Sequence, residues 1–232
     1  MAARFEEGPQ PATDDPGSRG APDGPARRRE AVRAGHGGDL TGALAAAGDS
    51  DPSVRVAALG ALARLGRFDG PALSTALGDP DPTVRRRACE AAGRLAGDPG
   101  DGLGAADAVG LLEAVLEDPD PLVAEAAAWA LGEQGALAGV EPVVIGALAA
   151  MAGGHPDALC REAAVAALGA LGDPAGLEAV LAALGDKPAV RRRAAVALAA
   201  FEDPRADEGL RQCLGDRDWQ VRQVAEDLLA EG

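Results

Sequence analysis

The sequence contains few aromatic residues: they make up 2% of its 232 residues, and tyrosine is absent. Hydrophobic residues nevertheless account for 47% of the chain, so a core has to be built mainly from Ala, Leu and Val. Such side chains suit close packing of helices. A chain of this length can form one or two globular domains, or one elongated domain of repeats.

Positive charge is also scarce, with 22 Lys and Arg residues against 37 Asp and Glu residues and a net charge of −15. A chain with this charge gains little from neutralising phosphates, and anionic membrane surfaces repel it. The first residues also lack the apolar stretch of an export signal. We therefore expect no nucleic acid and no membrane as partner, whereas basic or neutral partners fit.

Cysteine and histidine are too few and too scattered for a disulfide framework or a metal site. The three cysteines, Cys89, Cys160 and Cys213, form no C-x-x-C arrangement, which favours reduced thiols in a cytoplasmic protein. The spacing of Cys89 and Cys160 places both in the core. The two histidines, His36 and His155, lie in turns rich in Gly or Pro and form no metal-binding motif. We expect no metal and no cofactor.

The composition changes near residue 26. Residues 1–25 are rich in Pro, Gly and Asp and carry little to bury, so we expect a disordered tail. From residue 26 onward, short helical segments rich in Ala and Leu alternate with Gly, Asp and Pro. We expect residues 26–232 to form a single domain.

One motif recurs six times in this second part. The stretch "DPSVRVAALGALARLG" at 51–66 reappears thirty residues later as "DPTVRRRACEAAGRLAG". We align the copies on one apolar position, called the anchor. The anchors are Val54, Val84, Val123, Cys160, Val190 and Val221. Four residues after the anchor every copy has Ala, and nine residues after it every copy has Ala or Gly.

Each conserved column of the motif has a physical reason. Asp-Pro starts a helix, because Asp caps the free N–H groups and Pro has a preset φ angle. The anchor and the residues four and eight positions later form one buried helical face. Glycine inside a helix costs about 1 kcal/mol relative to Ala. Gly93, Gly132 and Gly169 therefore mark places where neighbouring helices leave no room for a side chain.

A shorter apolar segment precedes each copy, so the repeating unit is a helix–turn–helix. One such hairpin cannot bury its apolar face alone, and six stacked hairpins form a continuous core. The sequence thus predicts an all-α fold, a right-handed α-α superhelix, or solenoid, of about six helical hairpins. Trp219 stands near the start of the last copy, where we expect it to cover the end of this core.

The segments "DPSVRVAALGALARLGR" and "REAAVAALGALGDP" resemble the HEAT-repeat family. Their length of roughly thirty residues is similar to the short repeats of HEAT proteins of the phycobilisome-lyase type. The resemblance covers about residues 38–232. It implies the fold but not one activity, because the family includes scaffolds, adaptors, bilin lyases and a few metalloenzymes.

An arginine follows the anchor in five of the six copies, and Ala124 takes its place in the third. The HEAT resemblance implies that this arginine pairs with an aspartate of the loop region, which the Asp-Pro starts supply. The alternative is an anion-binding row of arginines. The "RRR" runs at 85–87 and 191–193 either form two basic spots beside this row or simply solvate the helix surface.

Residues two, six and ten positions after the anchor are expected to project from the concave surface. In the third copy these are Glu125, Trp129 and Glu133, and Glu90 and Glu162 flank them. Carboxylates around a tryptophan suit a basic peptide or a cationic small molecule. In the alternative, Trp129 only fills a groove and the glutamates keep the helix soluble.

The sequence therefore predicts a cytoplasmic scaffold or adaptor that binds a protein or peptide partner on its concave face. A second possibility is a lyase-like or other small-molecule-modifying enzyme in which Glu90, Glu125 and Glu162 supply acid–base groups. A third is a scaffold that associates with itself. The net charge and the scarcity of aromatic residues speak against a HEAT-like DNA glycosylase, because such an enzyme needs a basic groove rich in aromatic residues.

Overall fold

The computed structural model describes residues 23–94, 103–138 and 141–231. The predicted disordered tail, residues 1–25, falls almost entirely outside these ranges. Within them, the chain forms helices and turns and no strand. The predicted all-α fold class is confirmed.

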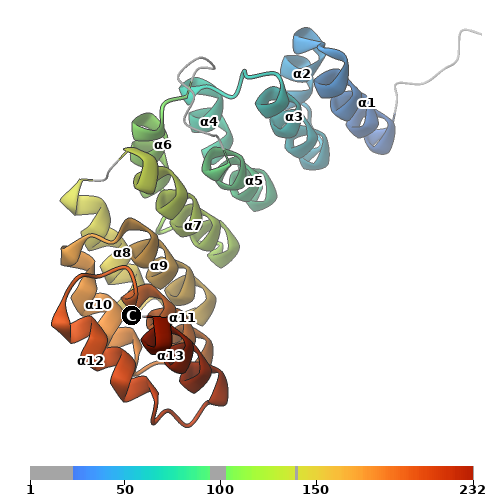
Figure 1. Ribbon diagram of the computed structural model, residues 1–232. Coiled ribbons are helices and arrows are strands. Elements are labelled where there is room, and N and C mark those ends of the chain that lie inside the picture. The colour runs from blue at the N-terminus through green and yellow to red at the C-terminus, as the bar shows by residue number, and fades with distance from the viewer. Residues whose placement is uncertain (1–22, 95–102, 139–140, 232) are drawn as a thin grey trace, which may run out of the picture.

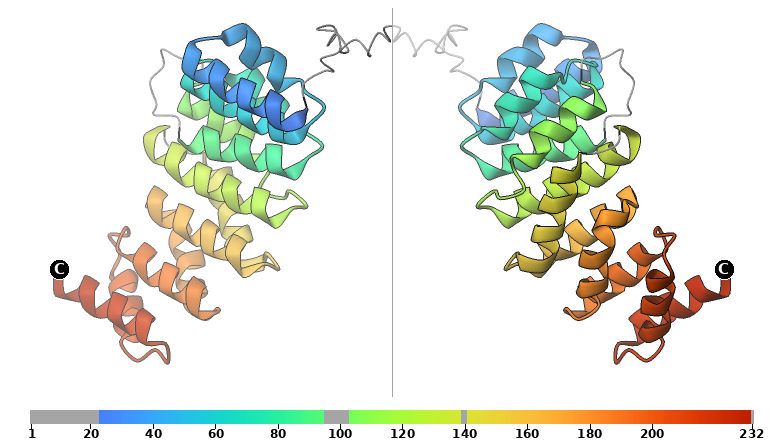
Figure 2. Two further views of the ribbon diagram at one scale, coloured as in Figure 1. Left: turned by 90° about the vertical axis from the view of Figure 1, so that its right-hand side faces the viewer. Right: turned by 90° about the vertical axis from the view of Figure 1, so that its left-hand side faces the viewer.

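Six helical hairpins follow one another along the chain (Figure 1). They are α2 (Leu40–Ala47) with α3 (Pro52–Arg64), α4 (Gly70–Leu77) with α5 (Pro82–Gly93), α6 (Ala105–Glu113) with α7 (Pro121–Ala138), α8 (Pro142–Gly154) with α9 (Ala158–Leu171), the short 3₁₀ helix η2 (Pro174–Gly176) and α10 (Leu177–Ala183) with α11 (Pro188–Leu198), and α12 (Pro204–Cys213) with α13 (Trp219–Glu231). The second helix of each hairpin packs against the second helix of the next. The result is a curved solenoid in which the odd-numbered helices lie inside the arc and the even-numbered helices outside (Figures 1 and 2).

An additional helix, α1 (Gly24–Gly37), precedes the first hairpin and packs on α3 as the inner helices pack on one another. Its Arg27 donates from Nε to Asp49 at 2.8 Å, just as the arginines of later copies pair with later loops. The motif alignment starts at Val54 and misses α1, because α1 has Ala26 at the anchor and exposed Glu30 four residues later. The stack therefore has seven inner helices and six outer ones among the described residues.

The Asp-Pro motif starts helices as predicted. Asp51, Asp81 and Asp157 each accept a hydrogen bond from the backbone N–H two residues later, at 2.8–2.9 Å. Asp120 and Asp218 do the same. Each cap satisfies a backbone donor that the first helical turn leaves without a partner.

The core is built from Ala, Leu and Val, and all six anchors are buried. The three glycines of the motif lie where inner helices meet. A Cβ atom on Gly132 or Gly169 would lie 3.0 or 2.9 Å from the Cα atom of Ala167 or Ala197 on the next inner helix. On Gly93 it would lie 2.5 Å from the indole ring of Trp129. The prediction that no side chain fits at these places is confirmed.

Four of the five arginines after the anchor form a row of ion pairs along one edge of the solenoid, here called the arginine ladder; the fifth, Arg222 of the last copy, donates to the backbone carbonyl of Asp216. Its members are Arg55–Asp79, Arg85–Asp118, Arg161–Asp186 and Arg191–Asp216, with closest N–O distances of 2.6–2.7 Å. Each guanidinium donates through two nitrogens to a carboxylate of the following hairpin and through a third to a backbone carbonyl of its own loop. The structural role that the HEAT resemblance implied is confirmed.

The partner of each ladder arginine differs from the expected one. We expected the aspartates of the Asp-Pro starts, but those cap helices. The partner stands one or two residues earlier, in the turn between the outer and inner helices of the next hairpin, as Asp79 does before Asp81. Asp79 also accepts from the backbone N–H of Asp81, so one carboxylate serves both the ladder and the turn.

The prediction for Trp219 is wrong. The side chain lies at the first position of α13 and is 64% exposed, so it does not cover the end of the core. Its position matches that of the prolines of other copies, which lie on the rim of the solenoid. In the last helix, Arg222 is half-buried and Glu226 is exposed.

Candidate functional site

The candidate site lies on the concave face, where α5, α7 and α9 run side by side (Figure 1). These helices carry Glu90 (α5), Glu125, Trp129 and Glu133 (α7) and Glu162 (α9), which we call the glutamate–tryptophan stripe. All five stand two, six or ten residues after an anchor, and among them Trp129 packs partly buried against the hydrophobic core. Glu133 is exposed, and the other four are half-buried.

Glu90 is surrounded by arginines of its own helix. Arg86, Arg87 and Arg94 approach its carboxylate at 3.1, 3.4 and 3.6 Å. One carboxylate thus serves three guanidinium groups, and the α5 end of the stripe carries excess positive charge. Sequence reasoning counted Glu90 as part of an acidic surface, although the three arginines stand within four residues of it.

Trp129 fills the space that Gly93 leaves open on α5. The guanidinium carbon of Arg94 lies 5.4 Å from the centroid of the indole ring, within the range of a cation–π contact. The ring therefore already has a cation of this chain as partner. The groove-filling role of Trp129 is supported, and an external cation has to share the ring with Arg94.

Glu125 has the most unusual electrostatic environment of the stripe. Burial raises the pKa of its carboxyl group above the ordinary value, and nearby Glu90 and Glu162 raise it further, while Arg86 opposes them. This interaction brings the three predicted acid–base candidates into one electrostatic group. Glu162 is also held by Arg193 of α11, at 3.6 Å.

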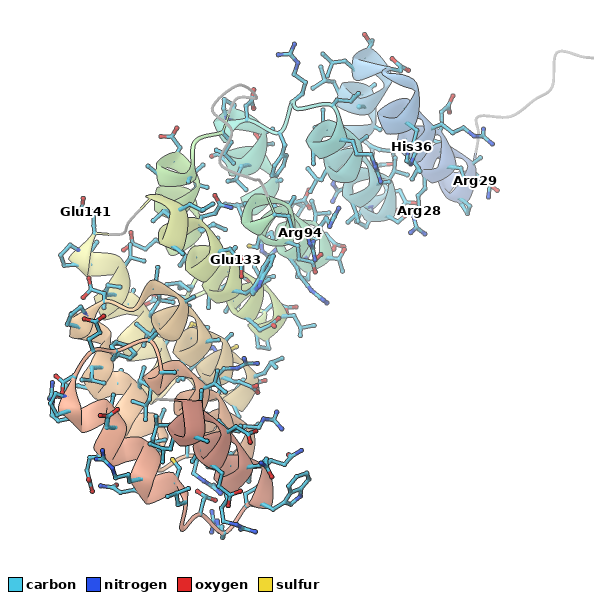
Figure 3. All side chains as sticks on the ribbon, viewed as in Figure 1. Arg28, Arg29, His36, Arg94, Glu133 and Glu141 are labelled. Carbon is cyan, nitrogen blue, oxygen red and sulfur yellow. The ribbon has the colours of Figure 1, made fainter. Side chains whose placement is uncertain are left out.

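Glu133 lies at the other end of the stripe, beside a groove of ≈ 530 Å³ between α5 and α7. Arg94, Trp129 and Leu137 line the same groove, and Leu137 is 64% exposed. Figure 3 shows Arg94 and Glu133 on the adjoining helices that border it. Across the described part of the chain, Glu133 has no ion-pair partner, so its carboxylate is open to a partner's cation.

The remaining candidates for chemistry lie in the core. Cys89, Cys160 and Cys213 are buried and form no disulfide. Burial raises the pKa of Cys89 to about 12 and that of Cys160 to about 11, which keeps both as unreactive thiols at neutral pH. The described residues contain no group of His, Cys, Asp and Glu that could hold a metal ion. None of the helices in the described ranges is long and apolar enough to cross a membrane.

The repeats match a known family model. The model, described as HEAT repeats, matches residues 40–102, 70–168 and 145–230. A comparison with curated proteins finds no match.

Solved structures with a similar fold include natural and engineered proteins. The complex of CpcE and CpcF of phycocyanin lyase from Nostoc sp. is 28% identical, with a TM-score of 0.56, and the match covers 94% of this chain and 80% of that one. The Escherichia coli protein YibA is 15% identical, with a TM-score of 0.61 and coverage of 92% and 76%. An engineered protein is 22% identical, with a TM-score of 0.58 and coverage of 83% and 97%. The last two establish the fold alone.

Proposed function

The chain belongs to the HEAT-repeat family, and we propose that it is a cytoplasmic scaffold that binds a protein or peptide partner on its concave face. The observation that carries this proposal is the glutamate–tryptophan stripe. Its exposed carboxylate (Glu133) and half-buried indole (Trp129) line one groove together with an exposed leucine outside the stripe, Leu137. Such a combination of an aromatic anchor with a polar rim is typical of surfaces that bind proteins.

The proposal favours a partner with basic residues. Glu125 and Glu133 offer carboxylates on one side of α7, and only Arg94 and Arg86 oppose them from α5. A lysine or arginine of a partner gains a charge-assisted hydrogen bond at Glu133, and its apolar neighbours gain contact with Leu137. The buried, unreactive thiols support a reducing compartment.

The test is a retention experiment with matched variants. The purified chain and a Glu125→Ala/Trp129→Ala/Glu133→Ala variant are immobilised and exposed to lysate of the source organism, and retained molecules are identified by mass spectrometry. We expect one protein to be retained by the native chain and lost from the variant. The purified partner should then form a stoichiometric complex without being consumed.

Two controls separate binding from folding. A Glu208→Ala/Trp219→Ala/Glu226→Ala variant removes one exposed tryptophan and two exposed glutamates outside the stripe, and it should retain the partner. A Glu125→Gln/Glu133→Gln variant leaves Trp129 in place and should weaken retention without lowering the melting temperature. Equal retention of the partner by the native chain and both stripe variants would contradict the proposal.

A second candidate function is an enzyme that uses Glu125 as general acid. The raised pKa of Glu125 favours this candidate, because a carboxyl group that holds its proton more tightly than usual is closer to the protonated form that a general acid needs. The likeness to the phycocyanin lyase complex supports the same reading. If a retained small molecule is chemically altered on incubation, and Glu125→Gln abolishes the change, the enzymatic function replaces the scaffold function as the proposal.

A further inference from the structure

A second groove on the concave face lies outside the glutamate–tryptophan stripe, with which it shares only Glu90. It has a volume of ≈ 450 Å³ and runs over the first turns of α1, α3, α5 and α7. Arginines and apolar side chains make up most of its lining, so we call it the basic groove. Figure 3 shows Arg28 at the first turn of α1, where the groove begins.

The basic groove carries positive charge in a chain whose net charge is −15. Arg28, Arg86 and Arg87 line it. Arg86 and Arg87 share Glu90, and the three arginines of the lining exceed its two carboxylates by one positive charge. The other acidic group, Asp120, accepts the backbone N–H of Leu122 as a helix cap.

Among the arginines that line the groove, Arg28 has the charge that nearby carboxylates balance least. Its side chain is exposed, and no carboxylate of the described residues lies within ion-pair distance of it. By contrast, the neighbouring Arg27 is ion-paired with Asp49 at 2.8 Å, as the ladder arginines are with their aspartates. The two adjacent arginines thus divide their roles, with Arg27 holding the fold and Arg28 facing the groove.

The groove also contains apolar surface suited to one side chain. Val56 of α3, Pro82 of α5 and Leu122 of α7 line it, and Leu122 is 44% exposed. An isolated inorganic anion would leave this surface uncovered. A ligand that carries carboxylates beside an apolar side chain matches both parts of the lining.

The surroundings of the basic groove favour a short acidic segment over a long polyanion as its ligand. The concave face continues from the basic groove onto α7 and α9, where Glu125 and Glu162 lie. A nucleic acid that ran along the face would bring its phosphates against these carboxylates, and the groove has no aromatic ring on which a base could stack. A short acidic segment avoids both problems.

We propose that the basic groove binds an acidic peptide segment of a protein partner, with its carboxylates on Arg28 and Arg86 and an apolar side chain against Val56 and Leu122. Guanidinium groups hold carboxylates through paired, charge-assisted hydrogen bonds. The inference rests on the proposed role of the concave face in peptide binding, but it uses residues that the stripe does not. A partner with an acidic segment followed by a basic one would place the acidic segment in the basic groove and the basic segment on the glutamate–tryptophan stripe.

The test uses fluorescence anisotropy with defined peptides. The probe is a short fluorescein-labelled peptide of glutamates around one central leucine, and the same peptide with glutamine or lysine in place of glutamate is the reference. We expect the native chain to bind only the glutamate peptide and added salt to weaken the binding. Arg28→Gln/Arg86→Gln should weaken it at least about tenfold.

A matched variant separates the groove from general attraction between charges. Arg29→Gln/Arg33→Gln removes two exposed arginines of α1 that do not line the groove, and it changes the net charge by the same amount. It should leave the affinity within about twofold. Equal weakening by both double variants would overturn the proposal, and so would a lack of binding to the glutamate peptide.

Two further arms identify the ligand class and keep the two proposals apart. A labelled oligothymidylate that binds more tightly than the peptide, and loses affinity in Arg28→Gln/Arg86→Gln, would assign the groove to nucleic acid and overturn the peptide. The Glu125→Ala/Trp129→Ala/Glu133→Ala variant should keep its affinity for the glutamate peptide. If it loses that affinity, the peptide lies on the stripe and the groove assignment fails, whereas the scaffold proposal stands.

Discussion

Two neighbouring boundaries in the stack are held in different ways. Between α5 and α7, Arg85 donates through two nitrogens to Asp118, at 2.7 and 2.9 Å. Between α7 and α9, the equivalent positions hold Ala124 and His155, so this boundary has no ladder pair. The arginine and its aspartate are both missing, because either one alone would leave a mostly buried charge without a partner.

Packing takes the place of the ion pair at the second boundary. Helix α7 has 18 residues against 12 in α5, and it packs closely on α9 where Gly132 meets Ala167. The anchor of α9 is Cys160, whose thiol donates to the backbone carbonyl of Pro121 at 3.1 Å. A ladder pair is therefore one of several ways to join two hairpins, and a longer inner helix is another.

Acid should have the largest effect on the stability of the boundaries that ladder pairs hold. Burial raises the pKa of Asp79 and Asp118, whereas the hydrogen bonds from Arg55 and Arg85 lower it, and the net shift is downward. Hydrogen bonds from Arg161 and Arg191 likewise lower the pKa of Asp186 and Asp216. A lowered pKa in the folded state gives stability that is present above the unfolded value of about 3.9 and lost as pH falls through the folded value. We expect the melting temperature to fall steeply below about pH 4, measured by circular dichroism.

Hydrogen exchange can separate the two kinds of boundary in acid. The amides of α3, α5, α11 and α13 should lose protection between pH 5 and pH 3 more than those where α7 meets α9, after correction for intrinsic exchange. Uniform loss along the stack would contradict the assignment of acid sensitivity to the ladder.

Removal of one rung should have the next largest effect. The side chain of Asp118 is only 5% exposed, so Arg85→Ala leaves a buried carboxylate unpaired. We expect a loss of about 3 kcal/mol in the free energy of unfolding, measured with urea. Arg86→Ala, on the adjacent exposed residue, is the control and should change stability by less than about 0.5 kcal/mol. Similar values for the two variants would show that the ladder is dispensable.

Installation of the missing rung should have a smaller effect. A hollow of ≈ 660 Å³ between α6 and α8 is lined by Asp118 and His155, the residues at two successive ladder positions. Ala124→Arg and His155→Asp should each destabilise the fold alone, because each introduces an unpaired charge. Together they should show a favourable coupling of about 1 kcal/mol in a double-mutant cycle. A coupling near zero would mean that the α7–α9 geometry excludes the pair.

Glu125 should give the smallest effect. Its pKa is raised by burial and by Glu90 and Glu162, so its ionised form costs stability above the unfolded pKa of about 4.3. Glu125→Gln should therefore stabilise the fold at pH 7 by less than about 1 kcal/mol, since solvent screens a group this exposed. The gain should vanish near pH 4, where the wild-type carboxyl is protonated. A gain that does not change with pH would reflect packing rather than charge.

The fold was predictable because its signals are local and repeated. The buried anchors and the small residues nine positions later hold in every copy, and the aspartate at the helix start holds in five of six, because these features depend only on helix geometry. Helix α1 was not recognised by this pattern because it has Ala26 where the other copies have a larger anchor residue. Its role is visible only through contacts with α3.

The environment of the candidate site was less predictable. The projection of Glu125, Trp129 and Glu133 from α7 follows from their spacing. The placement of Arg94 over Trp129 depends on how far α5 is rotated and shifted against α7, and a linear sequence does not contain that information. The same applies to the ladder partners, which come from the next hairpin.

The glycine–alanine contacts inside the arc also determine its radius. Inner helices meet backbone to backbone where Gly132 faces Ala167 and where Gly169 faces Ala197. A methyl group at either glycine would push two inner helices apart while the outer helices stayed in place, and the arc would open. The curvature of the concave face, and so the shape that a partner has to match, is thus set by how closely the backbones of neighbouring inner helices approach each other.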